Sequence, residues 1–380
     1  MDRQSFGILT PILEKEFHWT NSQYSWLVNA FTISYGFGML LGGCILDRFS
    51  LRTTYTAAIL LWSLAIMLHG FVGGWLGFLI VRLLLGFAEA GNHPCAVRAA
   101  GLFIPATQRS IPVSWINSGV NIGAMIAPFI LLFLSELWGW RTSFIIIGVL
   151  GLCWIPFWLY FCNHFPTLES NSVATNKKET DFSVIKSKPF LGFFIYRFCG
   201  DPCWYFLVFW LPKYFHETHH IDLKDFSHNL FYIYFLATLG NIGVGWLTQK
   251  IAKNDKNLVR QQSVLMGICA SGSLALLLIP FSPYLLLSTL FIGILAAGHQ
   301  GSMSLYFNQI ADIFGKENSA KITAWTTIGG VVSGVIFARI VGYALDQGVT
   351  YHTLFMFIPL LYLIGFGSFW ILTSKARKNV

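Results

Sequence analysis

Long apolar segments separated by short polar ones run along almost the whole of this 380-residue chain. A helix needs about 20 mostly apolar residues to cross the hydrocarbon core of a bilayer. The segments that meet this requirement lie at roughly 22–46, 51–72, 75–103, 111–134, 140–162, 190–215, 225–249, 259–280, 284–310, 319–345 and 351–373. The pattern therefore predicts an all-α polytopic membrane protein with about 11 full spans.

The longest polar stretch, 163–189, divides these segments into two groups. We interpret it as a cytoplasmic linker between an N-terminal helical half, 1–162, and a C-terminal helical half, 190–380. Residues before the first full span are too few to cross a bilayer, and Pro11 interrupts their apolar run. We expect residues 1–13 to be the end of a first transmembrane helix that is largely missing, which would give two six-helix halves.

Composition supports a membrane location and excludes several other classes of protein. Hydrophobic residues make up 55% of the chain and charged residues only 11%, whereas soluble domains carry about 25% charged residues. The net charge of +8 does not indicate nucleic-acid binding, because 16 of the 25 Lys and Arg lie in alternate loops on one predicted side. This bias predicts a multi-pass protein of the inner (plasma) membrane with a cytoplasmic C-terminus.

No motif in the sequence indicates an enzyme. A nucleotide-binding loop, a nucleophile triad and paired metal ligands are not recognisable, and the seven cysteines show no metal-ligand spacing. A His-rich loop at 216–222 is more simply interpreted as solvated than as a metal site. We therefore predict no enzyme activity, no cofactor and no metal.

Ionisable residues inside an apolar segment are the most informative local feature. Arg82 and Glu89 lie seven residues, or two helical turns, apart, so both would project from one face of a helix. Charges within a membrane are costly and usually face a protein interior or a wet cavity. This segment therefore predicts a polar path through the membrane.

Several motifs resemble those of the major facilitator superfamily. The stretch 43–52 reads GCILDRFSLR and is similar to the loop pattern G-x-L-a-D-R-x-G-R-[KR], from which Ser50 and Leu51 depart. A weaker copy, 245–250, ends the corresponding span of the second half. Within the superfamily the chain resembles anion:cation symporters, above all bacterial hexuronate and sugar-acid transporters. That closer resemblance rests on Asp2-Arg3, Gly86-Phe87-Ala88-Glu89-Ala90, Arg197-Phe198, Pro202 with Trp204, Trp210-Leu211-Pro212, Gly298-His299-Gln300 and Asp312-Ile313-Phe314-Gly315.

The resemblance implies a fold in which the first, fourth, seventh and tenth of twelve helices surround a central cavity. It also implies a secondary active transporter that imports a small organic anion, a hexuronate such as galacturonate or glucuronate, by proton symport with alternating access. Such a protein would act in the lipid bilayer as a monomer, with Na⁺ as the other candidate coupling ion. Two alternatives stay open: transport of another carboxylate, such as galactonate or an aromatic acid, and a degenerate homologue that does not transport.

Three charged residues are the leading candidates for coupling. Arg3 is the predicted clamp for a substrate carboxylate, because a guanidinium binds carboxylates through two parallel hydrogen bonds; the alternative is a pair with Asp2 or a lipid headgroup. Glu89 is the predicted proton carrier, and we expect it to interact with Asp2-Arg3 as well as with Arg82. The alternative is a permanent structural pair with Arg82. The family resemblance makes Asp2 a second carrier.

The other predicted roles are less specific. Arg197 could bind the anion or pair internally with Asp201, four residues on. Trp204 and Tyr35 could stack on a sugar ring or simply pack between helices. Hydroxyl-binding candidates are His299, Gln300, Asn117 and Asn121, the last two equally suited to holding helices together. The resemblance assigns gating or structural roles to Asp47, Arg48 and Arg82.

Overall fold

Every regular element that the structure describes is a helix. The computed structural model describes the backbone of residues 2–103, 110–164, 183–219, 221, 223–252, 258–282 and 284–379. It describes their side chains as well, except at 42–47, 93, 97, 100–103, 110–118, 183, 223–225, 252, 316–317, 320 and 378–379. Contacts divide the chain into two compact units, Met1–Glu179 and Thr180–Val380. Most of the predicted linker, 163–189, lies outside the described residues.

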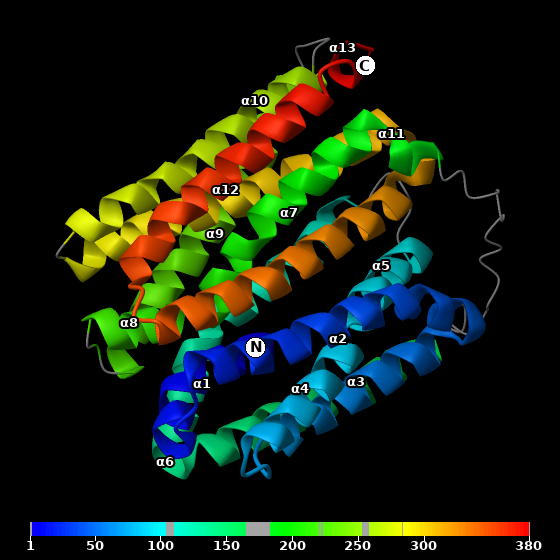
Figure 1. Cartoon of the computed structure of the whole chain (residues 1–380). Coiled ribbons are helices and arrows are strands. Elements are labelled where there is room, and N and C mark those ends of the chain that lie inside the picture. The colour runs from blue at the N-terminus through cyan, green and yellow to red at the C-terminus, as the bar shows by residue number, and fades with distance from the viewer. Residues whose placement is uncertain are drawn as a thin grey trace. The chain divides into compact units, whose positions relative to one another are not determined.

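The first unit is a bundle of helices coloured blue to green in Figure 1. Its elements are α1 (Asp2–Phe17), α2 (Asn21–Arg48), α3 (Leu51–Leu68), α4 (Trp75–Glu89), α5 (Asn92–Phe103) and α6 (Ser110–His164). Helix α4 packs against α2 and α3, and α6 packs against α1 and α3. Ser50, where the loop motif departs from the family pattern, caps α3, and its hydroxyl accepts a hydrogen bond from the Thr53 N–H at 3.2 Å.

The second unit is built around one long helical element. Its elements are η3 (Ser183–Lys186), α7 (Lys188–Phe209), α8 (Leu211–His219), α9 (Leu223–Ala252), α10 (Leu258–Ser271), η4 (Gly272–Phe281), α11 (Leu285–Asp346), α12 (Tyr351–Leu372) and α13 (Ala376–Asn379). Helix α11 packs against α7, α9 and α10, and α12 packs against α7 (Figure 1). Ser187 caps α7 by accepting the Phe190 N–H at 3.3 Å, and Pro189 fits the first turn, where no N–H is needed.

Eight helical segments of the described residues are long and apolar enough to cross a membrane. One of them, 119–164, has 46 residues, which at 1.5 Å per residue amounts to roughly 70 Å, about twice the thickness of a hydrocarbon core. That length exceeds a single crossing. The multi-pass character is therefore confirmed, while the 11 spans and the two six-helix halves stay predictions.

Single glycines interrupt the two longest helical elements. Gly139 in α6 has φ 80° and ψ 161°, and Gly315 in α11 has φ 78° and ψ 155°. This region of backbone space is open essentially to glycine alone, because a Cβ would clash there. Helix direction therefore changes at these residues, which lie in the gaps 134–140 and 310–319 between predicted spans.

Two predicted spans are interrupted where the sequence analysis expected continuous helices. The span 75–103 breaks after Glu89, and the span 190–215 breaks after Phe209. Each break precedes a proline by a few residues, Pro94 in one case and Pro212 in the other. Proline has no N–H to bond the carbonyl four residues earlier, and its ring crowds that carbonyl. The first break leaves Glu89 as the last residue of α4.

Aromatic side chains hold α1 in the first unit. Phe6 is buried and stacks on Tyr24 of α2 with ring centroids 5.7 Å apart. Near the end of α1, the Glu16 carboxylate accepts the Trp140 indole N–H at 2.6 Å and pairs with Arg141 at 2.8 Å. The indole hydrogen bond, followed by Arg141, lowers the pKa of this carboxyl group. The end of α1 is thereby tied to α6 just after its interruption.

Close approach of α2 and α4 depends on Gly86. A Cβ added at this position would collide with the Phe31 carbonyl oxygen and the Ser34 hydroxyl of α2. Small residues at such positions let transmembrane helices pack backbone to backbone. The α2–α4 interface therefore tolerates no side chain at this residue.

We expect Gly86→Ala to destabilise the first unit by about 1–3 kcal/mol, because the added methyl group overpacks the α2–α4 interface. Gly119→Ala is the matched control, since a Cβ at Gly119 meets no atom within 4 Å. Thermal unfolding of the purified protein in detergent measures both variants. Equal melting temperatures for the two would contradict the role of Gly86.

Candidate functional site

The first unit contains an ion pair between α1 and α4. Arg3 Nη2 lies 3.0 Å from Glu89 Oε1, and the two side chains are 31% and 19% exposed. The break before Pro94 ends α4 at Glu89. Two unit charges 4 Å apart attract by about 4 kcal/mol at an effective dielectric constant of about 20, and desolvation costs several kcal/mol per ion. Because attraction and desolvation are of similar size, either charged group can exchange its partner for another at a modest cost in free energy.

Aromatic rings and a second carboxylate surround this pair. The Arg3 guanidinium lies 4.4 Å from the Tyr35 ring centroid and 5.2 Å from that of Phe31, and these two rings stack on each other. Asp2, in the first turn of α1, lies within electrostatic reach of Glu89. The structure thus brings together four of the predicted site residues, Asp2, Arg3, Tyr35 and Glu89.

Arg82 of the same unit is completely buried. Its Nε donates to the Leu27 carbonyl at 3.2 Å, and its guanidinium lies 4.6 Å from the ring centroids of both Phe6 and Phe31. Arg82 therefore joins α4 to α1 and α2. The ion pair that the structure shows for Glu89 runs to Arg3 instead, because two turns along one helix separate Glu89 from Arg82 by about 10 Å of axial rise.

The remaining predicted residues of the first unit are not gathered around this pair by any contact that the structure shows. Asn121 is buried in α6, and Arg48 is exposed at the end of α2. The side chains of Asn117 and Asp47 lie outside the described residues. Their predicted roles therefore stay predictions.

The second unit holds its own buried ion pair within α7. Arg197 Nε and Nη2 lie 2.7 and 2.6 Å from Asp201 Oδ2. The side chains are only 13% and 8% exposed, and the guanidinium also faces the Tyr306 ring at 5.6 Å. Of the two arrangements that the sequence left open for Arg197, the structure shows the internal pair.

A polar and aromatic cluster lies nearby on α7, α11 and α12. His299 Nδ1 hydrogen-bonds the Tyr362 hydroxyl, and the Trp204 ring stacks on the His299 ring with centroids 5.2 Å apart and planes 6° from parallel. Gln300 is half-buried next to His299. Hydroxyl and imidazole groups of this kind bind neutral sugar hydroxyls, and an indole can stack on a sugar ring.

The sequence patterns did not identify two residues of these sites, Phe31 and Tyr362. Phe31 lies against both Arg3 and Arg82, and Tyr362 holds His299. Aromatic residues are so frequent in the apolar segments that neither stands out. The available signal for Tyr362 is the general rule that a buried tyrosine hydroxyl needs a polar partner.

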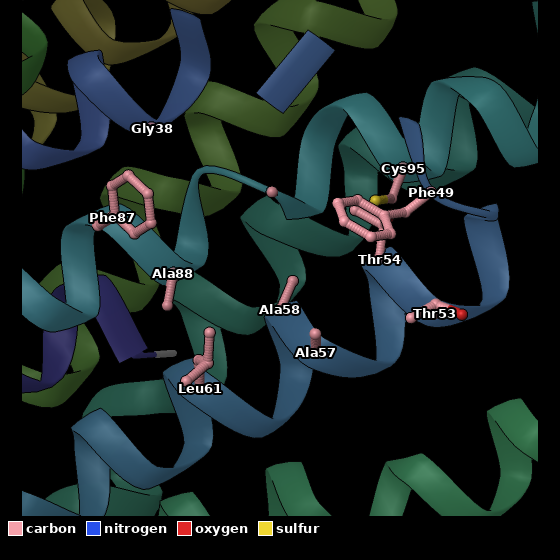
Figure 2. A pocket seen from close by; sticks show the side chains of 11 residues that line it. Gly38, Phe49, Thr53, Thr54, Ala57, Ala58, Leu61, Phe87, Ala88 and Cys95 are labelled. Carbon is pink, nitrogen blue, oxygen red and sulfur yellow. The ribbon is translucent and has the colours of Figure 1, made fainter. Parts of the chain in front are cut away.

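A cavity of about 260 Å³ lies between α2, α3, α4 and α5 (Figure 2). Ala57, Ala58, Leu61, Phe87 and Ala88 form much of its wall, as Figure 2 shows. Apart from two threonines its lining is apolar, and no charged side chain of the described residues contributes to it. This cavity therefore does not suit an organic anion.

Metal ligands do not converge in the parts of the chain that the structure describes. No group of three His, Cys, Asp or Glu is close enough there to hold an ion. His216 and His219, predicted to lie in a loop, are on α8, and His219 Nε2 hydrogen-bonds the Tyr214 hydroxyl at 3.0 Å. His220 and Asp222 lie outside the described residues.

The chain is similar to several known transporters. The hexuronate transporter of Escherichia coli (strain K12) is 26% identical over 100% of this chain and 92% of its own length. A "Probable galactarate/D-glucarate transporter" of the same organism is 24% identical over 99% of this chain and 90% of its own. The crystal structure of a bacterial homologue of the human lysosomal transporter Spinster has the same all-helical fold, with a TM-score of 0.77, 14% identity, and 100% and 94% coverage.

A family model decides the classification. The model described as "Major Facilitator Superfamily" matches residues 1–338, which is most of the chain. The proteins of this family are membrane transporters and not enzymes. The chain therefore belongs to the major facilitator superfamily.

Proposed function

We propose that the protein imports a hexuronate, such as galacturonate or glucuronate, across the inner membrane by proton symport with alternating access. The observation that carries the proposal is the Arg3–Glu89 ion pair, which puts an anion-binding cation and a proton-binding carboxylate in direct contact. The hexuronate and sugar-acid relatives support the substrate class. Alternating access follows from the family to which the chain belongs.

Coupling in this proposal is a competition for one guanidinium. In the empty carrier the Glu89 carboxylate occupies Arg3. A proton on Glu89 removes its negative charge and weakens its hold on the guanidinium, so that the substrate carboxylate takes its place. Loss of the proton restores the internal pair and expels the substrate. Asp2, within electrostatic reach of Glu89, is the second proton carrier of the proposal.

Neutral groups within each unit are further candidates for contacts with a sugar acid. Tyr35, which lies against Arg3, is placed to contact a ligand bound there. In the second unit His299, Gln300 and Trp204 offer hydrogen bonds and a stacking surface. Asn117 and Asn121 are retained as further hydroxyl-binding residues.

We expect proteoliposomes with an acidic exterior to accumulate hexuronate and a protonophore to abolish the accumulation. A panel of galacturonate, glucuronate, galactonate and an aromatic acid identifies the preferred substrate. Preference for galactonate or the aromatic acid would replace the hexuronate, and a sodium gradient that drives uptake alone would refute proton coupling. Failure of every acid to enter would favour a homologue that does not transport.

We expect Glu89→Gln to abolish uptake driven by a pH gradient and to spare counterflow exchange, because glutamine cannot carry a proton but leaves Arg3 available. Glu16→Gln makes the same chemical change at a carboxylate outside the site and serves as the control. Loss of both activities in Glu89→Gln would indicate a structural role for this residue. Driven uptake at the control's level would show that Glu89 carries no coupled proton.

We expect Arg3→Lys to raise the KM for hexuronate about ten- to a hundredfold. Lysine keeps the charge but lacks the two-pronged geometry of guanidinium, and a lost charge-assisted hydrogen bond is worth about 1.5–3 kcal/mol. Arg141→Lys, at the outer pair with Glu16, is the matched control. Initial rates of counterflow over a range of substrate concentrations give the KM of each variant. An unchanged KM in Arg3→Lys would remove Arg3 from the binding site.

A further inference from the structure

The apolar cavity of the first unit is elongated along α3. Thr53, Ala57 and Leu61 line it at four-residue intervals and lie along one side of this helix, as Figure 2 shows. Eight residues of helix rise by about 12 Å, so the cavity extends over about two helical turns. Phe87 and Cys95, on the two sides of the break between α4 and α5, line it as well. A long apolar space of this kind fits a hydrocarbon chain better than a compact ligand.

The cavity opens on the surface of the first unit. Thr53, Ala57 and Leu61 are exposed, and so are the lining residues Phe49 and Phe87. An apolar cavity of about 150 Å³ stays dry and binds benzene, and this cavity is larger, at about 260 Å³. Because the protein is a multi-pass membrane protein, lipid chains are the most abundant apolar molecules at such an opening.

One end of the cavity is polar and basic. Thr53 and Thr54, which line it, belong to the first turn of α3, and Arg52 directly precedes them. Arg48, the last residue of α2, directly precedes the lining residue Phe49 and is exposed. No carboxylate of the described side chains lines the cavity. A guanidinium has five N–H donors, so each arginine can contact a phosphate and keep its other partners.

A third arginine lies at the same end. Cys95 lines the cavity and belongs to a small buried cluster with Leu51, the first residue of α3. Arg98 of α5 lies within electrostatic reach of the Cys95 thiol. Positive charge is therefore gathered where the apolar space ends, which complements a lipid that has an anionic headgroup.

We propose that this cavity binds one acyl chain of an anionic phospholipid, such as phosphatidylglycerol, with the lipid phosphate held at Arg48 and Arg52. A zwitterionic headgroup also carries a phosphate, but the same arginines repel its ammonium group. The exposed Leu61 and Phe87 offer an apolar surface for the second chain of a phospholipid, which a fatty acid lacks. The proposal does not depend on the transported substrate.

The test measures lipid binding to the full chain purified in detergent by native mass spectrometry. Dioleoyl phosphatidylglycerol, dioleoyl phosphatidylcholine and oleate are titrated separately, so that all three carry the same chain. Ala57→Phe fills the cavity from an exposed position, with the smaller change Ala57→Leu beside it. Ala324→Phe, at an exposed position of α11 that does not line the cavity, is the matched control.

A second pair of variants tests the headgroup. The double variant Arg48→Gln/Arg52→Gln removes two cations at the polar end of the cavity. The control Arg260→Gln/Lys375→Gln removes two exposed cations of the second unit. The measured quantity is the ratio of the phosphatidylglycerol affinity to the phosphatidylcholine affinity.

We expect the wild type to bind one phosphatidylglycerol at least about tenfold more tightly than phosphatidylcholine, as a charge-assisted contact provides. Ala57→Phe lowers the phosphatidylglycerol affinity at least about tenfold, Ala57→Leu lowers it less, and Ala324→Phe leaves it unchanged. Arg48→Gln/Arg52→Gln removes the preference for phosphatidylglycerol, whereas Arg260→Gln/Lys375→Gln keeps it.

Three results would overturn the proposal. Equal binding of the two phospholipids by the wild type removes the anionic headgroup, and tighter binding of oleate than of phosphatidylglycerol replaces the phospholipid by a fatty acid. Wild-type affinity for phosphatidylglycerol in every folded variant at position 57 removes the cavity as the site of the chain. None of these results bears on hexuronate transport, which the uptake measurements test separately.

Discussion

The dominant constraint on this protein is the cost of holding charge inside an apolar helical bundle. A guanidinium or carboxylate moved into such surroundings loses several kcal/mol of hydration even after relaxation. Each of these charged groups has a nearby partner that offsets part of the cost. Arg3 contacts Glu89 and Arg197 contacts Asp201. Arg82 lies between a carbonyl and two aromatic rings. In the first unit, these contacts join α1, α2 and α4.

The two ion pairs differ in how helix movement affects them. Arg3 and Glu89 lie 86 residues apart on different helices, so any relative movement of α1 and α4 changes their distance. Arg197 and Asp201 are one turn apart on α7 and move with it as a unit. An interhelical pair can therefore break and re-form during a transport cycle. An intrahelical pair keeps its geometry when its helix moves.

Much of this organisation was accessible from the sequence, because apolar segments and misplaced charges are local signals. The same locality explains why the Arg197–Asp201 pair could be named as an alternative: four-residue spacing puts the two side chains on one helix face. The contact of Glu89 with Arg3 could be predicted only from the family resemblance, since the two residues meet through tertiary packing. The break before Pro94 was missed for a different reason. The apolar residues on both sides were grouped into one span, although the polar residues Asn92 and His93 and the absent N–H of Pro94 lie between them.

In the proposed cycle, competition for Arg3 would match one proton to one monovalent acid. In the empty carrier the site holds a guanidinium and the ionised Glu89. In the loaded carrier of the proposed cycle it holds the same guanidinium, a neutral Glu89 and the substrate carboxylate. The net charge of the site is therefore the same in both states, so neither state carries an additional buried charge whose desolvation would cost several kcal/mol. A diacid with a single proton would break this equality by one charge.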